Sequence, residues 1–224
     1  MIQDPKVSRT VIAKRVALEL KDGDIVNLGI GIPTLVANYI PKGVTVFFQS
    51  ENGILGMGPA PEPGYENPNL NNAGGSPVTF IPGAAAFDSA TSFGLIRGGH
   101  VDITVLGGLQ VDEEGHLANW MIPGKLIPGM GGAMDLVTGA KKVIVAMTHV
   151  EKGGVPKIVK KCSLPLTSVR RVDLIVTDMA VIEVTEKGLV LKEVAPETTI
   201  EEVLKFTEAR LLLPETVPTM PISL

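Results

Sequence analysis

Strand-like and helix-like patterns alternate along this 224-residue chain from its first segment onward. Apolar residues recur at helical spacing from Ser8 to Leu20, which indicates an amphipathic helix. The apolar run 25–29 predicts a short strand, and Pro33 suits the first turn of a helix that ends near Ile40. The run 44–48 predicts a second buried strand. Two parallel strands connected through a helix are the simplest interpretation of this order.

The alternation continues toward the C-terminus. Asp112–Gly115 is typical of a hairpin turn, and Thr199 with Glu202 forms the Thr-x-x-Glu pattern of a capping box. Further helices are expected near 87–97, over 132–138 and from Thr199, and further strands at 101–106, 142–148, 173–184 and 188–194. Neither an internal repeat nor a linker is evident. The sequence therefore predicts a single α/β domain over residues 1–224, with a mainly parallel open sheet flanked by helices.

One long segment lacks either pattern. Glycine, proline and asparagine dominate from Gly53 to Gly83. Irregular chain of this length is uncommon inside a compact domain unless it serves a site. We therefore expect a functional surface loop here.

Composition and charge exclude several classes of protein. Apolar residues make up 45% of the chain, and 20 basic against 24 acidic side chains leave a net charge of −4. With only 4% aromatic residues, these values argue against a dedicated nucleic-acid binder. No stretch approaches the roughly 20 apolar residues of a membrane span, and residues 1–10 lack the apolar core of a signal peptide. We expect a cytoplasmic protein that associates with neither membranes nor nucleic acid, and whose surplus apolar surface enters a core or a subunit interface.

Glu51 is the first candidate for chemistry. It follows a strongly apolar strand and precedes Asn52-Gly53, a turn-forming pair. Ligands of open α/β sheets gather at the carboxyl ends of strands, where an oriented carboxylate can act as nucleophile, base or acceptor. A solvated acid at a turn is the alternative, and position alone does not separate the two.

The segment Gly29-Ile30-Gly31 lies where a dinucleotide-binding fold places its first turn. The G-x-G-x-x-G fingerprint fails at its third glycine, because the sequence has Thr34. Glu51 nevertheless lies about twenty residues downstream, where such folds place a ribose-binding acid. A dinucleotide-binding oxidoreductase therefore remains an alternative function.

Residues 129–136 form a glycine-rich turn that leads into a helix, so free amide groups there can bind a developing oxyanion. A tight connection between packed elements is the other interpretation. His100, His116 and His149 lack metal-ligand spacing, so no metal site is expected. Cys162 is expected to be a small semi-buried residue, and the basic run 157–161 fits a solvated surface strand better than a phosphate site.

Four separated motifs resemble a known family, the beta subunits of family I CoA-transferases. They are Asn27-Leu28-Gly29-Ile30-Gly31-Ile32-Pro33-Thr34, Ser50-Glu51-Asn52-Gly53, Ile96-Arg97-Gly98-Gly99-His100-Val101-Asp102 and Gly131-Gly132-Ala133-Met134-Asp135-Leu136. The likeness runs from about residue 8 to about residue 210. The stretch 118–125 resembles the members that use acetoacetate, which act in ketone-body and short-chain fatty acid metabolism.

This resemblance implies that Glu51 is the nucleophile of a ping-pong reaction. Acetyl-, butyryl- or succinyl-CoA would donate CoA through a glutamyl-CoA thioester on Glu51, and acetoacetate, a short-chain 3-oxoacid, would accept it. The expected oxyanion and positioning residues are Asn27, Gly29, Gly31, Asn52, Gly131 and Gly132. Coenzyme A is then a substrate, no cofactor is tightly bound, and an alpha subunit completes a hetero-oligomer. A scaffold whose partner holds all the chemistry is the non-catalytic alternative.

Overall fold

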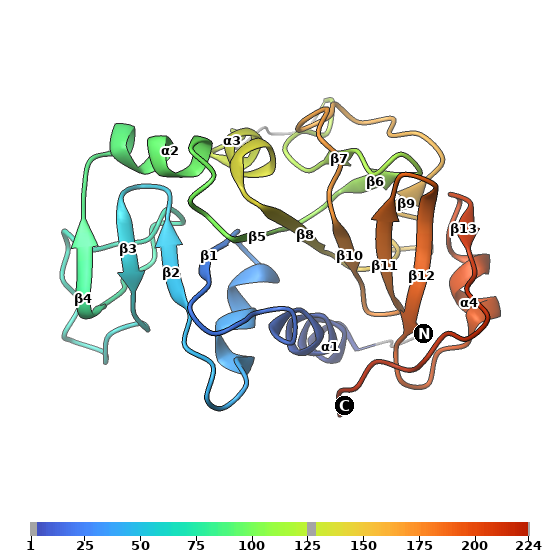
Figure 1. Cartoon of the computed structure of the whole chain (residues 1–224), viewed down its shortest axis with the longest axis horizontal. Coiled ribbons are helices and arrows are strands. Elements are labelled where there is room, and N and C mark those ends of the chain that lie inside the picture. Colours follow the sequence, from blue (N-terminus) through green and yellow to red (C-terminus); the bar gives the residue numbers. More distant parts are fainter. Residues whose placement is uncertain (1–3, 125–128, 224) are drawn as a thin grey trace.

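The computed structural model describes residues 4–124 and 129–223, and Figure 1 shows its elements along one twisted sheet. The helices are α1 (Pro5–Ala17), the 3₁₀ helix η1 (Pro33–Tyr39), α2 (Ser89–Arg97), α3 (Ala133–Gly139) and α4 (Ile200–Lys205). The strands are β1 (Ile25–Leu28), β2 (Phe47–Ser50), β3 (Ile54–Met57), β4 (Phe80–Ala86), β5 (Ile103–Leu106), β6 (Gln110–Asp112), β7 (Leu117–Ala118), β8 (Lys142–Ala146), β9 (Ile158–Val159), β10 (Leu174–Val176), β11 (Ala180–Thr185), β12 (Gly188–Val194) and β13 (Leu211–Leu212).

The large sheet has ten strands in the order β13-β12-β11-β10-β8-β5-β1-β2-β3-β4. Its centre, from β2 through β1, β5 and β8 to β10, is parallel throughout. Antiparallel strands extend it on both sides, and a second sheet has the order β7-β6-β9. The predicted fold class, an α/β domain with a mainly parallel open sheet, is confirmed.

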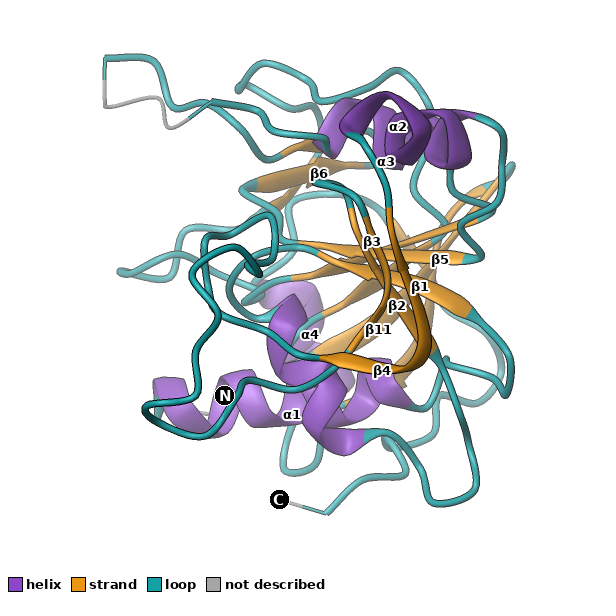
Figure 2. Ribbon diagram, turned by 90° about the vertical axis from the view of Figure 1, so that its left-hand side faces the viewer, coloured by secondary structure: helices purple, strands orange, loops and turns teal. Residues whose placement is uncertain are grey.

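Both faces of the central strands are buried, as expected for a parallel sheet covered on two sides. Along β8, Val143 and Val145 pack into one core cluster with α2 and α3, whereas Ile144 and Ala146 pack into the other with α1 and η1. Figure 2 shows the sheet between α2 and α3 on one side and α1 on the other. This layering places α2 and α3 over the face that carries the candidate site.

Several expected elements are confirmed. The segment β1–η1–β2 is the predicted unit of two parallel strands with a helical connection, although η1 is a 3₁₀ helix. The turn at Asp112–Gly115 connects antiparallel strands β6 and β7. Thr199 caps α4, and Glu202 completes the predicted capping box.

Other expectations were wrong in extent. The segment 53–83 is not wholly irregular, because its ends form β3 and the start of β4, which pair with each other. The second strand covers Phe47–Ser50 rather than 44–48, so it runs up to Glu51. The expected strand 173–184 is divided between β10 and β11, which reverse at Thr177.

The basic run 157–161 does not form a solvated strand. Ile158 and Val159 are β9 and fully or almost fully buried, and Lys157 is buried as well. Pairing with β6 draws this segment inward, so only Lys160 and Lys161 are exposed. Lys125, at the end of the stretch 118–125, lies outside the described residues. Among those that are described, no helix has the length and apolar character needed to cross a membrane.

Candidate active site

Glu51 stands at the carboxyl end of β2, in a turn that the main chain fixes. The Gly53 amide donates to the Ser50 carbonyl at 3.0 Å, and the Phe87 amide donates to the Gly53 carbonyl at 2.9 Å. Gly53 has φ +118°, and a Cβ there would overlap the Phe87 carbonyl oxygen. Only glycine fits this position, so the Asn-Gly pair ties the turn that carries Glu51 to the chain entering α2.

The Glu51 carboxylate faces the glycines before α3, 81 residues along the chain. Its Oε1 accepts a hydrogen bond from the Gly132 amide at 3.0 Å. A Cβ on Gly132 would lie 3.0 Å from Glu51 Cδ, and one on Gly131 would lie 3.3 Å from Oε1. The structure thus brings together three of the residues predicted for the site, Glu51, Gly131 and Gly132, and the absence of side chains permits the close approach.

Contacts with α2 hold α3 in this place. Gly139 packs against the Ile96 carbonyl so closely that a Cβ would overlap it. Arg97 Nε and Asp135 Oδ1 are 2.6 Å apart, although this pair is largely exposed and contributes little stability. The ring of Phe93 lies beside Gly132. Two helices packed at short range therefore set the position of the Gly132 amide.

A buried polar row lies on the α2-facing side of the sheet. The register aligns Thr104, Asn27 and Gln49 on three adjacent strands. Asn27 Nδ2 donates to Gln49 Oε1 at 2.7 Å, and Gln49 Nε2 donates to Ser92 Oγ at 2.9 Å. Within the described chain, Asn27 Oδ1 and Thr104 Oγ1 have no hydrogen-bond partner. Such groups are rare in a core and often accompany function.

The sequence analysis missed Gln49 and Ser92 in this row. Gln49 was assigned to the end of a strand, where a polar residue is expected to meet solvent. The only signal for it was the strand register, which places Gln49 directly opposite Asn27. Nothing in the sequence marked Ser92, a polar residue in a mainly apolar helix.

The remaining predicted residues are not in contact with the Glu51 carboxylate. The Gly29 amide donates to the Val105 carbonyl at 2.8 Å, so this group is engaged within the sheet. Gly31 has φ +95° and is exposed, with open space around its Cα. Asn52 Nδ2 donates to the Asn71 carbonyl at 2.7 Å. This geometry does not favour a dinucleotide site, because the turn amide is used and a 3₁₀ helix follows it.

Other reactive groups are poorly suited to catalysis. Burial, together with the charge of Asp112, raises the pKa of the Cys162 thiol to about 12, so its nucleophilic thiolate is disfavoured. Burial lowers the pKa of Lys157 to about 8, against the opposing effects of Glu151 and Asp178. In the part of the chain that the structure describes, no three or more His, Cys, Asp or Glu side chains are grouped to hold a metal ion.

His149 is fully buried between two hydroxyl groups. Its Nδ1 and Nε2 lie 2.9 Å from Thr177 Oγ1 and Thr207 Oγ1, and its amide donates to Asp178 Oδ1. Burial lowers its pKa from 6.5 to about 4; Lys157 acts in the same direction and Asp178 opposes it. The imidazole is therefore neutral at pH 7 and serves the structure.

The buried His149 predicts a loss of stability in mild acid. The unfolded chain takes up the proton below pH 6.5 and the folded chain only near pH 4, so stability is lost as the pH falls through this window. We expect His149 to account for about 3 kcal/mol of the decrease in the free energy of unfolding between pH 7 and 4. Urea denaturation across this range measures it. His149→Gln should flatten the slope, whereas the exposed His100→Gln should retain it; equal slopes in all three proteins would contradict the assignment.

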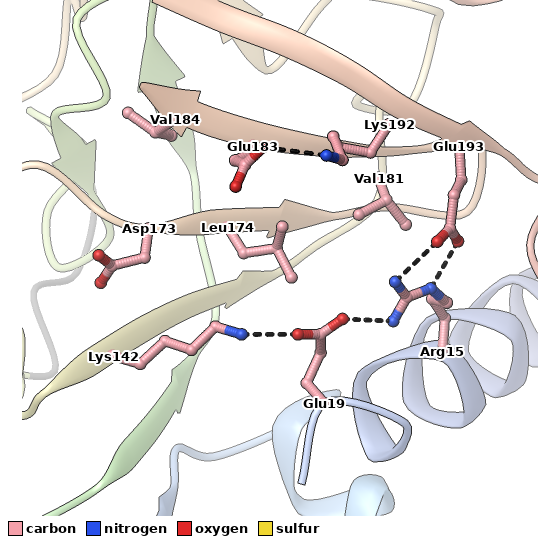
Figure 3. Close-up of a pocket in the computed structure, with 10 residues that line it drawn as sticks. All are labelled: Arg15, Glu19, Lys142, Asp173, Leu174, Val181, Glu183, Val184, Lys192 and Glu193. Atoms are coloured by element: carbon pink, nitrogen blue, oxygen red, sulfur yellow. Dashed lines mark hydrogen bonds and ion pairs between the residues drawn. The ribbon is translucent and has the colours of Figure 1, made fainter. Parts of the chain in front are cut away.

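A cavity of about 290 Å³ lies at the opposite edge of the sheet (Figure 3). Lys142 and Leu174, which begin β8 and β10, line it, so it lies at the amino ends of the parallel strands. Arg15, Glu19, Lys142 and Glu193 form one connected set of ion pairs there. Because these charges satisfy one another and ligands favour the other edge of such sheets, we regard Glu51 as the centre of the active site.

Comparisons with known proteins agree with this choice of site. The family model described as Coenzyme A transferase matches residues 9–205. The beta chain of the acetate CoA-transferase of Haemophilus influenzae is 56% identical over 216 residues, which cover 96% of each chain. The smaller partner of a probable succinyl-CoA:3-ketoacid coenzyme A transferase of Bacillus subtilis, its B-type chain, is 53% identical, over 95% of this chain and 98% of that protein.

A solved structure shares the fold. The apoenzyme of an acyl-CoA transferase from Escherichia coli O157:H7 superposes with a TM-score of 0.78 and 23% identity, covering 98% of this chain. At this identity the likeness establishes the fold alone. The present chain spans 44% of the length of that protein.

Proposed function

This chain belongs to the coenzyme A transferase family as a subunit of the beta type, and we propose from this that it transfers CoA between an acyl-CoA and acetoacetate through a thioester on Glu51. One observation carries the mechanistic part of the proposal. The Glu51 carboxylate lies at a strand end and is held at 3.0 Å by the Gly132 amide, with only glycines against it. The site thus leaves a carboxylate oriented and accessible to a substrate carbonyl.

In the first half-reaction, a carboxylate oxygen of Glu51 attacks the thioester carbonyl of the acyl-CoA. The carbon–sulfur bond breaks, so the products are an acyl-glutamyl anhydride and the CoA thiolate. The thiolate then attacks the glutamyl carbonyl of this anhydride. Glu51 becomes a CoA thioester, and the acyl group leaves as a free carboxylate.

The second half-reaction runs the same steps backward with acetoacetate. Its carboxylate attacks the Glu51 thioester carbonyl and expels the CoA thiolate. The thiolate attacks the acetoacetyl carbonyl of the new anhydride, which forms acetoacetyl-CoA and restores Glu51. Because the first product leaves before the second substrate reacts, ping-pong kinetics are expected.

Each attack places negative charge on an oxygen that was a carbonyl oxygen. We assign the Gly132 amide to the Glu51 side of this chemistry, because it already donates to Oε1 and needs no reorganisation as charge develops there. Gly131 leaves space beside Oε1. Asn27 and Asn52 are proposed as positioning residues, and Gly29 and Gly31 as residues that allow close approach of the chain at the end of β1.

The nucleotide part of CoA needs a further binding surface. The names of the related chains, which designate them as one of two kinds of subunit, support the proposal that an alpha subunit supplies it in a hetero-oligomer. Coenzyme A is then a substrate rather than a tightly bound cofactor. The substrate names of these relatives leave acetyl-, butyryl- and succinyl-CoA as donors to be compared.

The function is tested on the chain co-expressed and purified with its partner subunit. Initial rates are measured with each of the three acyl-CoA donors at several fixed acetoacetate concentrations. Parallel double-reciprocal lines are the expected result, and converging lines would reject a ping-pong reaction through the enzyme. Failure of every donor to yield acetoacetyl-CoA would reject the assigned acceptor.

Adding a methyl group at Gly132 is expected to slow transfer by about 10- to 100-fold. The backbone at Gly132 has φ −85°, which alanine adopts readily, so the fold should be retained. The new Cβ would press on Glu51 Cδ at 3.0 Å and displace the carboxylate, and small misplacements of reacting groups are costly. The measurement is kcat of Gly132→Ala in the assembled complex.

Gly94→Ala is the matched control for this variant. Gly94 lies in the adjacent α2, and no atom approaches the position of an added Cβ within 4 Å. Its kcat should equal that of the unchanged protein. A Gly132→Ala protein with normal kcat would show that the spacing between these two groups does not matter for transfer.

A further inference from the structure

We propose that residues 71–76, here called the clamp, position the Glu51 turn for transfer; this inference rests on the proposed function. The clamp reaches the turn on both sides of Glu51. The Ala73 amide donates to Ser50 Oγ at 2.9 Å, and Asn52 Nδ2 donates to the Asn71 carbonyl at 2.7 Å. The residues before and after the carboxylate are therefore both bonded to one segment that is about twenty residues distant in sequence.

The clamp is internally fixed, so it can act as a support. Asn72 Oδ1 accepts hydrogen bonds from the amides of Gly74 at 2.9 Å and Ser76 at 3.0 Å. The Asn72 amide donates to the Ser76 carbonyl, and the Gly75 amide donates to the Asn72 carbonyl. One asparagine side chain thus closes the turn, a common use of this residue in loops. Its loss would loosen the clamp without altering Ser50, Asn52 or Glu51.

The clamp contributes little to the core. None of its residues belongs to either hydrophobic core cluster, and residues 73–76 are exposed. If its hydrogen bonds are lost, the Ala73 amide and the Asn71 carbonyl remain near water and are not left stranded in the core. A role confined to stability is therefore a poor explanation for two bonds that bracket the reacting residue.

Positioning is needed because the Glu51 side chain has one described hydrogen bond, from the Gly132 amide. The carboxylate must meet a carbonyl carbon in two successive attacks, and each attack depends on alignment. Bonds at Ser50 and Asn52 restrict the main chain on both sides of Glu51. The Gly132 amide then selects the direction of its side chain.

The test compares Ser50→Ala and Asn72→Ala with Asn67→Ala in the assembled complex. Asn67 Oδ1 accepts from the Asn69 amide in the same loop but makes no described contact with the Glu51 turn, so it is the matched control. The readouts are kcat, KM for the acyl-CoA, the single-turnover rate of Glu51 thioester formation, and Tm. We expect Ser50→Ala and Asn72→Ala each to lower kcat and the single-turnover rate by about tenfold, with KM and Tm nearly unchanged. Asn67→Ala should match the unchanged protein.

A double variant separates positioning through shared contacts from independent effects. Adding Ser50→Ala to Asn72→Ala should cost less than the product of the two single effects, because both act on the same bonds. A lower Tm with unchanged kcat would overturn the proposal by making the clamp purely structural, and a raised KM alone would overturn it by making the clamp a substrate contact. Transfer by the unchanged protein without a Glu51 adduct would reject the proposed function itself, whereas a normal adduct with unchanged variant rates would reject the clamp alone.

Discussion

Replacing Glu51 with glutamine is expected to lower CoA transfer by about 10⁴-fold or more, because it removes the atom that forms the covalent intermediate. Glutamine has nearly the same shape and keeps a side-chain oxygen to accept from the Gly132 amide. The arrangement of the turn should therefore survive while the nucleophile is lost. Steady-state rates of the assembled complex measure the effect, and thermal denaturation should give a Tm close to that of the unchanged protein.

Two further results make this prediction specific. Glu62→Gln makes the same chemical change at an acid in the loop between β3 and β4, and it should retain full activity. Incubation of the unchanged complex with acyl-CoA, followed by borohydride reduction and peptide mass spectrometry, should locate the modification on Glu51. Retained turnover in Glu51→Gln, or an adduct on another residue, would refute the nucleophile and favour a scaffold whose partner performs the chemistry.

Local sequence patterns predicted much of the fold because they act over a few residues. The run 142–148 and the turn before Gly188 are decided by apolar periodicity and by turn chemistry, and both have counterparts in the structure. The strand at 44–48 was misplaced because Gln49 and Ser50 appear polar, although the helix above the sheet buries them. Tertiary contacts overrode the local preference there.

The site was accessible to sequence reasoning only in part. A strand-end acid and a glycine-rich helix start can each be recognised alone, and the resemblance linked them. The contact between Glu51 and Gly132 depends on the close packing of α2 on α3, to which no sequence pattern points. For the same reason, the segment 53–83 predicted a functional loop but not that Ala73 would bond to Ser50.

A chain of ion pairs ties α1 to the sheet on the face away from Glu51 (Figure 3). Arg15 donates to both oxygens of Glu193, at 2.6 and 2.9 Å, and to Glu19 at 2.8 Å. Glu19 in turn accepts from Lys142 at 2.6 Å. Burial opposes the charge of Arg15, but the hydrogen bonds to Glu193 and Glu19 outweigh it and raise its pKa. Only 9% of the Arg15 side chain and 17% of the Glu193 side chain are exposed, so this pair is far less screened than a surface pair.

Arg15→Met should therefore lower the free energy of unfolding by about 3–5 kcal/mol, because it leaves Glu193 buried without its counter-charge. Arg9→Met on the exposed side of α1 is the matched control and should change stability by about 0.5 kcal/mol or less. Adding Glu193→Leu to Arg15→Met should recover most of the loss, since an apolar pair can replace a buried ion pair without a large cost. Urea denaturation of the four proteins at pH 7 decides the matter. If the double variant is as unstable as Arg15→Met, the loss comes from packing of the arginine stem rather than from an uncompensated charge.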